Sequence, residues 1–346
     1  MKKLFLLSVA ATLTCSIGFA KIWRVNNNIG ITANFTSLQE AHNGAASGDT
    51  LYLESSPTSY GALTSTKKLA IIGTGYFLDV NPGLQAFALP SKVDGITLNA
   101  GAEGTSIEGL SLNGSAVSIN AVNDIVIRRN HFASFNGTIA DWSVGIVYIN
   151  SGASNIFITQ NYGLIIQNNT ASTGILISNN YIAHYAYNGD ATNGQCIQLN
   201  PNTVAIIKNN IFRRGRVTAY NSNITNNIMF TGFIDGSGNL ISNNIADGTQ
   251  FGNTDGNKQN IDMASVFAGA TASYDAYFKL KAGSPAIGAG YGSTALTPVD
   301  CGMFGGSGSY VLSGIPAIPS IYFFANQPVG SNSDPIDVQV KVRSNN

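Results

Sequence analysis

The sequence predicts an all-β fold in which short parallel strands stack as the rungs of a solenoid. Three observations predict it: a motif that recurs along the middle of the chain, apolar residues that alternate with a period of two, and glycine and asparagine between the alternating stretches. Charged residues make up only 10% of the chain, and hydrophobic residues make up 44%. A chain of this composition can form a hydrophobic core and is not expected to be disordered.

The recurring motif is apolar, any, apolar, polar, polar, Asn, as in ILISNN at 175–180. Six copies align on their last residue: Asn130, Asn161, Asn180, Asn210, Asn227 and Asn244. The intervals between these anchors are 31, 19, 30, 17 and 17 residues, and a weaker copy lies upstream at 107–112. A unit of this length is too short for two helices. It fits one rung of short strands joined by tight turns.

The anchor asparagines are predicted to be structural. Asparagine tolerates the left-handed or bridge conformation of a sharp turn, so one at the same bend of every rung is expected. If the amides point inward, each can donate a hydrogen bond to the amide of the next rung, which gives a continuous ladder. A ligand-binding role for these asparagines is the alternative.

Two segments outside the repeats carry a resemblance to a known family. The first comprises FTSLQEA at 35–41, AASGDTLYL at 45–53 and the pair at 60–61; the second comprises KLKAGSPAIGAG at 279–290 and DCGMFGG at 300–306. Together with the repeats they resemble the right-handed parallel β-helix proteins of the pectate-lyase-like superfamily, over roughly residues 22–306. The resemblance implies a right-handed parallel β-helix whose N-terminal end is closed by a short helix, with Thr36 as its N-cap. It implies little about function, because this architecture hosts lyases, hydrolases, epimerases, adhesins and inert surface proteins.

Residues 1–20 have the pattern of a secretory signal peptide. Lys2 and Lys3 precede an apolar stretch at 4–11, and small residues end at Ala20. We therefore expect export to the extracellular space, the cell surface or the periplasm, with cleavage near Ala20. A lipoprotein attached through Cys15 is the alternative. No later stretch has the length of apolar residues that a membrane span requires.

The mature chain is predicted to comprise a β-helix domain at 21–312 and a C-terminal extended tail at 313–346. Strands are expected at 320–325 and 336–342, and the second alternates valines with polar residues, as a half-buried strand does. The tail is expected to cover the C-terminal end of the solenoid, which would otherwise expose an unpaired edge. An interaction or anchoring role is the alternative.

The net charge of the chain and the spacing of its acidic residues argue against several classes of function. The formal net charge is +0, from 18 basic and 18 acidic residues, so a nucleic-acid binder is not expected. No Asp-x-Asp pair lies near the repeats, which argues against a calcium site and against the paired carboxylates of most glycosidases. No metal and no cofactor is therefore expected. Cys196 and Cys301 are either two buried thiols, which is favoured, or a disulfide.

The two long intervals between anchors predict a binding cleft. Insertions around 136–143 and 185–194 flank one ordinary rung, and basic residues lie close by in sequence. Aromatic rings stack on sugars and arginines bind carboxylates, so an extended acidic polysaccharide is the expected ligand. The predicted binding residues are Trp142, Tyr185, Tyr187, Asp190, Arg213, Arg214 and Arg216. The column immediately before the anchors is expected to be an exposed polar face: Arg129, Gln160, Asn179, Asn209, Asn226 and Asn243.

Catalysis is the second interpretation of the same cleft. A metal-independent branch of the superfamily uses a lysine and an arginine on neighbouring rungs, and by this resemblance Lys208 and Arg214, with His184 nearby, are the catalytic candidates. The favoured interpretation is a secreted, non-catalytic protein that binds a polysaccharide. The alternative is a lyase that acts on a glycan containing uronic acids. The sequence leaves the oligomeric state open.

Overall fold

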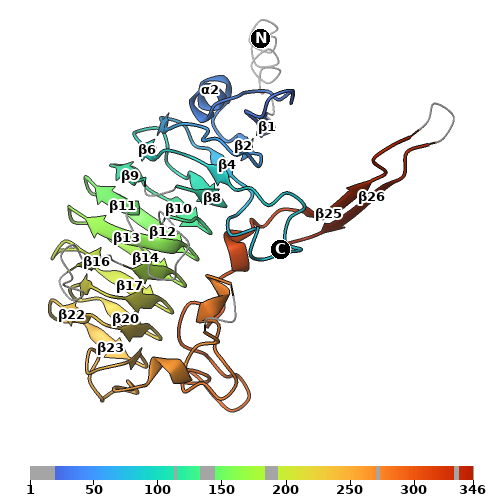
Figure 1. The fold of residues 1–346 in the computed structure, drawn as a ribbon. Coiled ribbons are helices and arrows are strands. Elements are labelled where there is room, and N and C mark those ends of the chain that lie inside the picture. Colours follow the sequence, from blue (N-terminus) through green and yellow to red (C-terminus); the bar gives the residue numbers. More distant parts are fainter. Residues whose placement is uncertain are drawn as a thin grey trace, which may run out of the picture.

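Ten parallel strands stack into one sheet along the length of the molecule, one strand to each rung (Figure 1). The computed structural model describes residues 20–112, 115–132, 145–183, 194–269, 273–330 and 335–345. In their order within the sheet the ten strands are β1 (Ile22–Val25), β2 (Thr50–Leu53), β4 (Ala70–Ile72), β7 (Ser106–Glu108), β10 (Ile125–Arg128), β12 (Ser154–Thr159), β14 (Thr173–Ser178), β17 (Ala205–Lys208), β20 (Asn223–Thr225) and β23 (Leu240–Ser242). We call this sheet A.

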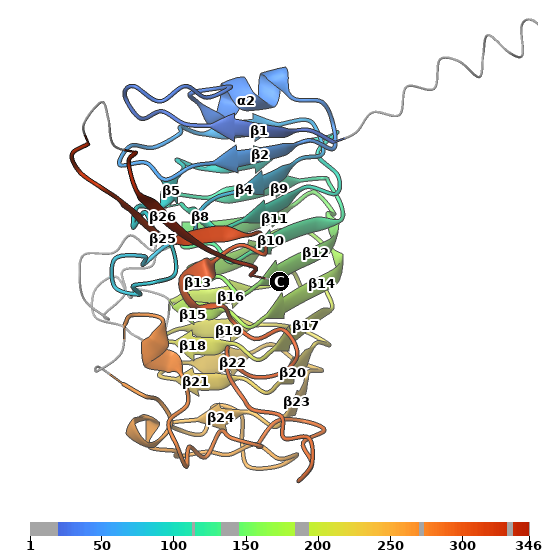
Figure 2. The same ribbon diagram turned by 90° about the vertical axis from the view of Figure 1, so that its right-hand side faces the viewer.

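A second sheet of twelve strands, sheet B, completes each rung (Figure 2). Its strands are β3 (Leu63–Ser65), β6 (Ile96–Leu98), β9 (Val117–Asn120), β11 (Gly145–Asn150), β13 (Tyr162–Asn168), β15 (Tyr181–Ala183), β18 (Ile211–Arg213), β21 (Ile228–Phe230), β24 (Ile245–Ala246), β16 (Gln195–Gln198), β19 (Arg216–Thr218) and β22 (Phe233–Asp235). A separate pair joins β5 (Ser91–Lys92) to β8 (Leu110–Ser111). The predicted fold class, an all-β parallel β-helix, is confirmed.

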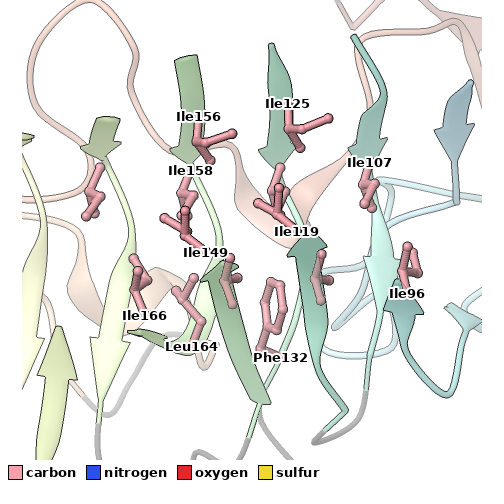
Figure 3. Close-up of a cluster of buried hydrophobic side chains, with 14 of the residues drawn as sticks. Ile96, Ile107, Ile119, Ile125, Phe132, Ile149, Ile156, Ile158, Leu164 and Ile166 are labelled. Carbon is pink, nitrogen blue, oxygen red and sulfur yellow. The ribbon is translucent and has the colours of Figure 1, made fainter. Parts of the chain in front are cut away.

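The period-two alternation of the sequence explains how the rungs stack. Ile125 pairs in register with Ile156, and Ile127 with Ile158, so like side chains lie above one another in the interior. All four of these isoleucines are 0% exposed. Figure 3 shows such side chains from both sheets meeting inside the coil. Because neighbouring strands lie about 4.8 Å apart, each rung buries its apolar side chains against the next rung.

Helix α2 (Leu38–Gly44) closes the N-terminal end, as predicted, and buries Leu38 and Ala41. Its N-cap is Ser37, whose Oγ accepts a hydrogen bond from the Glu40 amide at 3.3 Å. The prediction of Thr36 was therefore wrong by one residue. The Thr36 hydroxyl instead donates to the Glu40 carboxylate at 3.1 Å, because it lies one position too early to reach the free amides of the first turn.

The predicted asparagine ladder is continuous. The Nδ2 of each anchor donates to the Oδ1 of the next anchor at 3.0 or 3.1 Å, from Asn130 to Asn244. The row extends one step further than predicted, to Asn257. Each Oδ1 also accepts the backbone N–H of the preceding anchor, so the amides are satisfied although the six predicted anchors are 0% exposed. This confirms the structural interpretation.

The left-handed backbone of each turn belongs to the residue before the anchor, whereas the sequence analysis assigned it to the anchor itself. These residues have φ between +54° and +58°: Arg129, Gln160, Asn179, Asn209, Asn226 and Asn243. Gly109, before Leu110, and Gly256, before Asn257, also have positive φ, at +72° and +75°. The left-handed residue and the anchor that follows it therefore have different structural roles. The first residue turns the chain, and the second bonds one rung to the next.

After β24 the chain turns back and runs along the outside of the turns, towards the N-terminal rungs (Figures 1 and 2). We call residues 261–269 and 273–318 the returning segment; it contains the 3₁₀ helices η2 (Met263–Ser265), η3 (Ala276–Phe278) and η4 (Leu312–Gly314). All six residues of the left-handed column bond to its backbone through their side chains. The donors are Asn243 to Ala289 O (3.2 Å), Asn209 to Asp300 O (3.0 Å), Asn179 to Met303 O and Gly305 O (3.0 and 2.8 Å), Gln160 to Gly308 O (2.9 Å), and Arg129 to Ile315 O (3.0 Å), and the Oδ1 of Asn226 accepts from Tyr291 N (2.7 Å). The expectation that this column is an exposed face was wrong. Asn179 and Asn209 are only 3% exposed.

A second hydrophobic core lies between the returning segment and the outside of the coil. The residues that follow the anchors point outward and are buried there: His131, Tyr162, Tyr181, Ile211, Ile228 and Ile245. The returning segment covers them with Val266, Phe267, Phe278, Cys301 and Met303, among others. Cys196 and Cys301 are buried thiols whose sulfurs donate to Arg214 O and Asn243 O, so the favoured interpretation of the two cysteines is confirmed.

The C-terminal tail forms a two-stranded antiparallel hairpin, β25 (Ser320–Asn326) and β26 (Val338–Arg343). The expectation that it covers the C-terminal end of the solenoid was wrong. Because the returning segment carries the chain back first, the base of the hairpin bonds to the 84–86 loop, where Ala86 N donates to Ile321 O and the Arg343 guanidinium donates to Leu84 O, both at 2.8 Å. Strand β26 is not half-buried, since Val338, Val340 and Val342 are 45–59% exposed.

Replacement of one ladder asparagine tests its contribution to stability. Asn210→Leu removes the acceptor of the Asn180 backbone N–H and of the Asn180 side-chain amide, both at 3.0 Å. A buried donor without a partner costs about 1–3 kcal/mol, so we expect the free energy of unfolding to fall by at least about 2 kcal/mol. Urea titration of the mature protein measures it.

Asn169→Leu is the matched control. Asn169 is an exposed asparagine that also donates to an asparagine of the neighbouring rung, Asn150, at 2.8 Å. Because its groups can bond to water, the change is expected to be within about 0.5 kcal/mol. Equal urea midpoints for wild type and Asn210→Leu would contradict the stabilising role of the ladder.

Candidate binding surface

The outer face of sheet B carries a column of polar side chains that is continuous from rung to rung. Its members are paired in register across β9, β11, β13, β16, β19 and β22: Ser118, Tyr148, Gln167, Gln198, Thr218 and Asp235. We call this set the outer column. It faces outward because the alternate residues of the same strands, such as Ile149 and Ile197, are 0% exposed in the interior.

A second row of amides runs beside the outer column. Asn120 donates to Asn99, Asn150 to Asn120, and Asn169 to Asn150, at 3.0, 3.1 and 2.8 Å. We call these four residues the outer ladder. Unlike the anchors, its members are half-buried or exposed. Apart from Thr218, which is 8% exposed, the face therefore presents ordered amides and hydroxyls to solvent at the repeat of the rungs.

Three arginines gather at a sharp corner between β18 and β19. Arg213 ends β18, Arg214 is left-handed with φ of +59°, and Arg216 begins β19. Gly215 makes the corner feasible, because a Cβ at this position would lie 2.4 Å from Gly194 O. The sequence RRGR thus places three arginines at the corner where β19 begins, with Arg213 in register with Ala183 and Phe230 on the side of the second core.

Aromatic rings and polar groups of neighbouring rungs hold two of these arginines. The guanidinium carbons of Arg213 and Arg216 lie 5.5 and 5.7 Å from the ring centres of Phe230 and Phe233. A guanidinium nitrogen of Arg216 lies 3.6 Å from the Asp235 carboxylate. The Gln195 amide, with its oxygen turned towards Arg216, accepts two hydrogen bonds from it at 2.9 and 3.1 Å. The charge of Arg216 is therefore partly neutralised within the protein.

The structure brings some of the predicted site residues together and separates others. Arg213, Arg214 and Arg216 share the corner described above. Lys208 lies on sheet A, in register with Ser178 and Thr225, as the repeat predicted. Between Lys208 and the corner lies Ile211, which is 0% exposed beneath the returning segment. Lys208 and Arg214 therefore lie on different faces and do not form one site.

The remaining predicted residues lie outside the residues that the structure describes: Trp142, His184, Tyr185, Tyr187 and Asp190. The two insertions that hold them precede β11 and β16, strands of the outer face two rungs apart. The cleft between these insertions stays a prediction.

Acidic groups near the corner are already engaged. A depression of about 430 Å³ is lined by Phe230, Asp247, Asn260, Ile261, Asp262 and Met263. Asp247 accepts from the Thr231 amide at 3.0 Å, and Asp262 caps helix η2. Over the described ranges, no group of three or more His, Cys, Asp or Glu side chains is arranged to hold a metal ion.

The largest pKa shifts belong to groups buried beneath the returning segment. Burial lowers the pKa of His131 to about 3 and raises the pKa of Cys301 to about 12. Burial also raises the pKa of Tyr76 and of Tyr310, whose hydroxyls are 2.6 Å apart. These shifts follow from the packing of the second core and do not mark a catalytic centre on the outer face.

Sequence analysis missed the outer column and the outer ladder, although the chain contains a signal for them. A polar residue two positions before an asparagine recurs at the end of five rungs: Thr97 and Asn99, Ser118 and Asn120, Tyr148 and Asn150, Gln167 and Asn169, and Gln198 and Asn200. Alignment on this second motif would have placed both rows on one outward face.

Comparison with known proteins leaves the family of this chain unassigned. Neither a scan against protein-family models nor a search of curated proteins found a match. Within the described part of the chain, no helix is both long and apolar enough to cross a membrane.

The shifted pKa of His131 makes stability depend on pH. The folded protein holds this imidazole neutral to about pH 3, whereas an unfolded histidine takes up a proton near pH 6.5. The stability that this group contributes is complete above about pH 6.5 and falls as the pH approaches 3. From pH 7.5 to 4.5, wild type should lose about 2–3 kcal/mol more stability than His131→Leu.

Urea titration of both proteins at the two pH values measures this difference. At pH 7.5, the difference in unfolding free energy between wild type and His131→Leu gives the cost of the substitution itself. The same loss in both proteins would show that other groups cause the acid sensitivity.

Proposed function

We propose that this is a secreted, non-catalytic protein that binds an extended acidic polysaccharide along the outer face of sheet B. The observation that supports it is the outer column and outer ladder, rows of amides and hydroxyls that pass beside the corner of Arg213, Arg214 and Arg216 at the start of β19. The returning segment covers the opposite side of the turns and leaves this face open (Figure 1).

The chemistry of the face suits a polymer of sugars. Amide side chains both donate and accept hydrogen bonds, as sugar hydroxyls do, and Tyr148 adds an aromatic surface. Because equivalent side chains recur at about 4.8 Å, a repeating ligand would meet similar groups along its length. Arg214 supplies a planar pair of donors for a carboxylate, whereas Arg216 is already paired with Asp235.

Export is part of the proposal and rests on the predicted signal peptide. The exported protein should begin at Lys21, or within a residue or two, because small residues precede that position. Amino-terminal sequencing of the folded protein from its native host measures this. An intact Met1 on the exported protein would contradict it, and a lipid-modified Cys15 would identify a lipoprotein instead.

A polysaccharide lyase of the pectate-lyase-like superfamily is the alternative, and it rests on the resemblance of the repeats and of the two flanking segments. A lyase needs a base and a cation that neutralises the uronate, close together. Because Lys208 lies on the other sheet, this alternative depends on Arg214 and His184. An absorbance assay for unsaturated products on acidic polysaccharides separates the two functions.

The double variant Arg214→Ala with Arg216→Ala tests the binding face. Binding to an acidic polysaccharide that wild type retains should weaken about tenfold or more at low salt, and the difference should shrink at high salt. The melting temperature should change little, because both side chains are partly exposed. A glycan array selects the ligand, and titration in a salt series measures affinity.

The matched control is Arg128→Ala with Lys208→Ala. It also removes two positive charges, but from the outer face of sheet A. If the control weakens binding as much as the corner variant does, general charge attraction explains the affinity. If the corner variant binds like wild type, the outer face is not the site.

A further inference from the structure

The C-terminal hairpin exposes one largely apolar face, on which Asn326, opposite Val338, is a polar member. Its pairing places Ile321 opposite Val342, and Phe324 opposite Val340, with Val338 on the same side of β26. These five side chains are 45–59% exposed. We call them the apolar face. An apolar patch of this size is often functional, so it indicates an interaction surface.

The opposite face of the hairpin carries cationic and aromatic side chains. There Lys341 lies over the ring of Phe323 at 5.0 Å, and Arg343 over the ring of Tyr322 at 5.5 Å. The aromatic rings of this face are thus covered by the hairpin's own cations. Gln339 adds a further polar side chain, since it alternates with the valines of β26.

The hairpin also stands away from the solenoid. Figure 1 shows it projecting on the side of the returning segment. Its base is held by the bonds of Ala86 and Arg343 described above. A two-stranded hairpin is marginally stable in water, and it gains stability when its apolar face is packed against another element. Among the described residues, nothing buries the apolar face.

We propose that the apolar face binds the same face of a second copy of this chain, which makes a twofold dimer. Charge determines which faces of the two hairpins meet. The apolar face has no charged member, so two copies meet without repulsion, whereas two opposite faces would bring Lys341 and Arg343 against their equivalents. A twofold contact of one surface with itself is also the commonest interface of homo-oligomers.

The size of the face sets the strength of the dimer. An aromatic side chain offers on the order of 200 Å², and valine and isoleucine are smaller, so five half-exposed side chains supply at most on the order of 500 Å² from each copy. The pair then buries on the order of 1,000 Å², at the lower limit for a specific interface. The dimer is therefore reversible and depends on protein concentration.

Val340→Glu tests the proposal, with Gln339→Glu as its matched control. The two positions are adjacent on β26 and gain the same side chain, but only Val340 lies on the apolar face. Sedimentation of the full mature chain over a range of concentrations should give a monomer–dimer equilibrium for wild type and Gln339→Glu. Val340→Glu should weaken dimerisation at least tenfold, since it buries an unpaired charge.

Cysteine crosslinking provides a second measurement that does not depend on a disruptive charge. Under mild oxidation Val340→Cys should form an interchain disulfide, and Gln339→Cys should not. The native thiols do not compete, because Cys196 and Cys301 are buried. Circular dichroism of each variant checks that the solenoid is intact.

Three outcomes would overturn the proposal: a wild type that is monomeric at every concentration, a Val340→Glu variant that dimerises like wild type, or equal crosslinking of the two cysteine variants. A monomeric wild type would assign the apolar face to a different partner. Glycan binding by the outer face is measured separately and does not affect these results.

Discussion

The buried amide ladder is the constraint on which the other features of this structure depend. Each anchor side chain is 0% exposed and must find its hydrogen-bond partners in the neighbouring rungs, so the rungs can stack in one register only. Once the anchors are fixed, every other position of a rung has a defined direction. The residue before an anchor is left-handed and faces the returning segment, as Asn179 does. The residue after an anchor points outward, as Ile211 does.

The second core follows from that geometry and decides where a ligand can bind. A column of large side chains faces outward after the anchors, and the chain covers it with its own C-terminal segment. The left-handed column receives the backbone of that segment through hydrogen bonds, for example from Asn209 to Asp300 O. This side of the molecule is thereby closed, whereas the returning segment does not cover the polar outer face of sheet B. The covered column lies between Lys208 and Arg214, so these two side chains do not form one site.

The features that could be predicted from the sequence are those that arise from the local repeat. Period-two alternation and one asparagine per unit are enough to fix the strands, the register and the ladder. The returning segment has no period, and its contacts join residues far apart in the chain, such as Asn179 and Gly305. Short polar side chains in the left-handed column therefore looked solvent-exposed, although they bond to buried backbone. The tail was misplaced for the same reason. The arginine corner was found because its members are contiguous, whereas the outer column required a second alignment.

The two proposed surfaces are separate, and their separation has a physical consequence. The hairpin projects on the side of the returning segment, while the outer face lies on strands such as β11, β13 and β16 (Figure 1). Both can be occupied at once, so a dimer would carry two glycan-binding faces. Contacts between exposed charges are weak and screened by salt, which limits the affinity of one face. A long polymer that meets both faces binds the second one intramolecularly, so its overall affinity exceeds that of either face alone if the dimer geometry lets the polymer reach both.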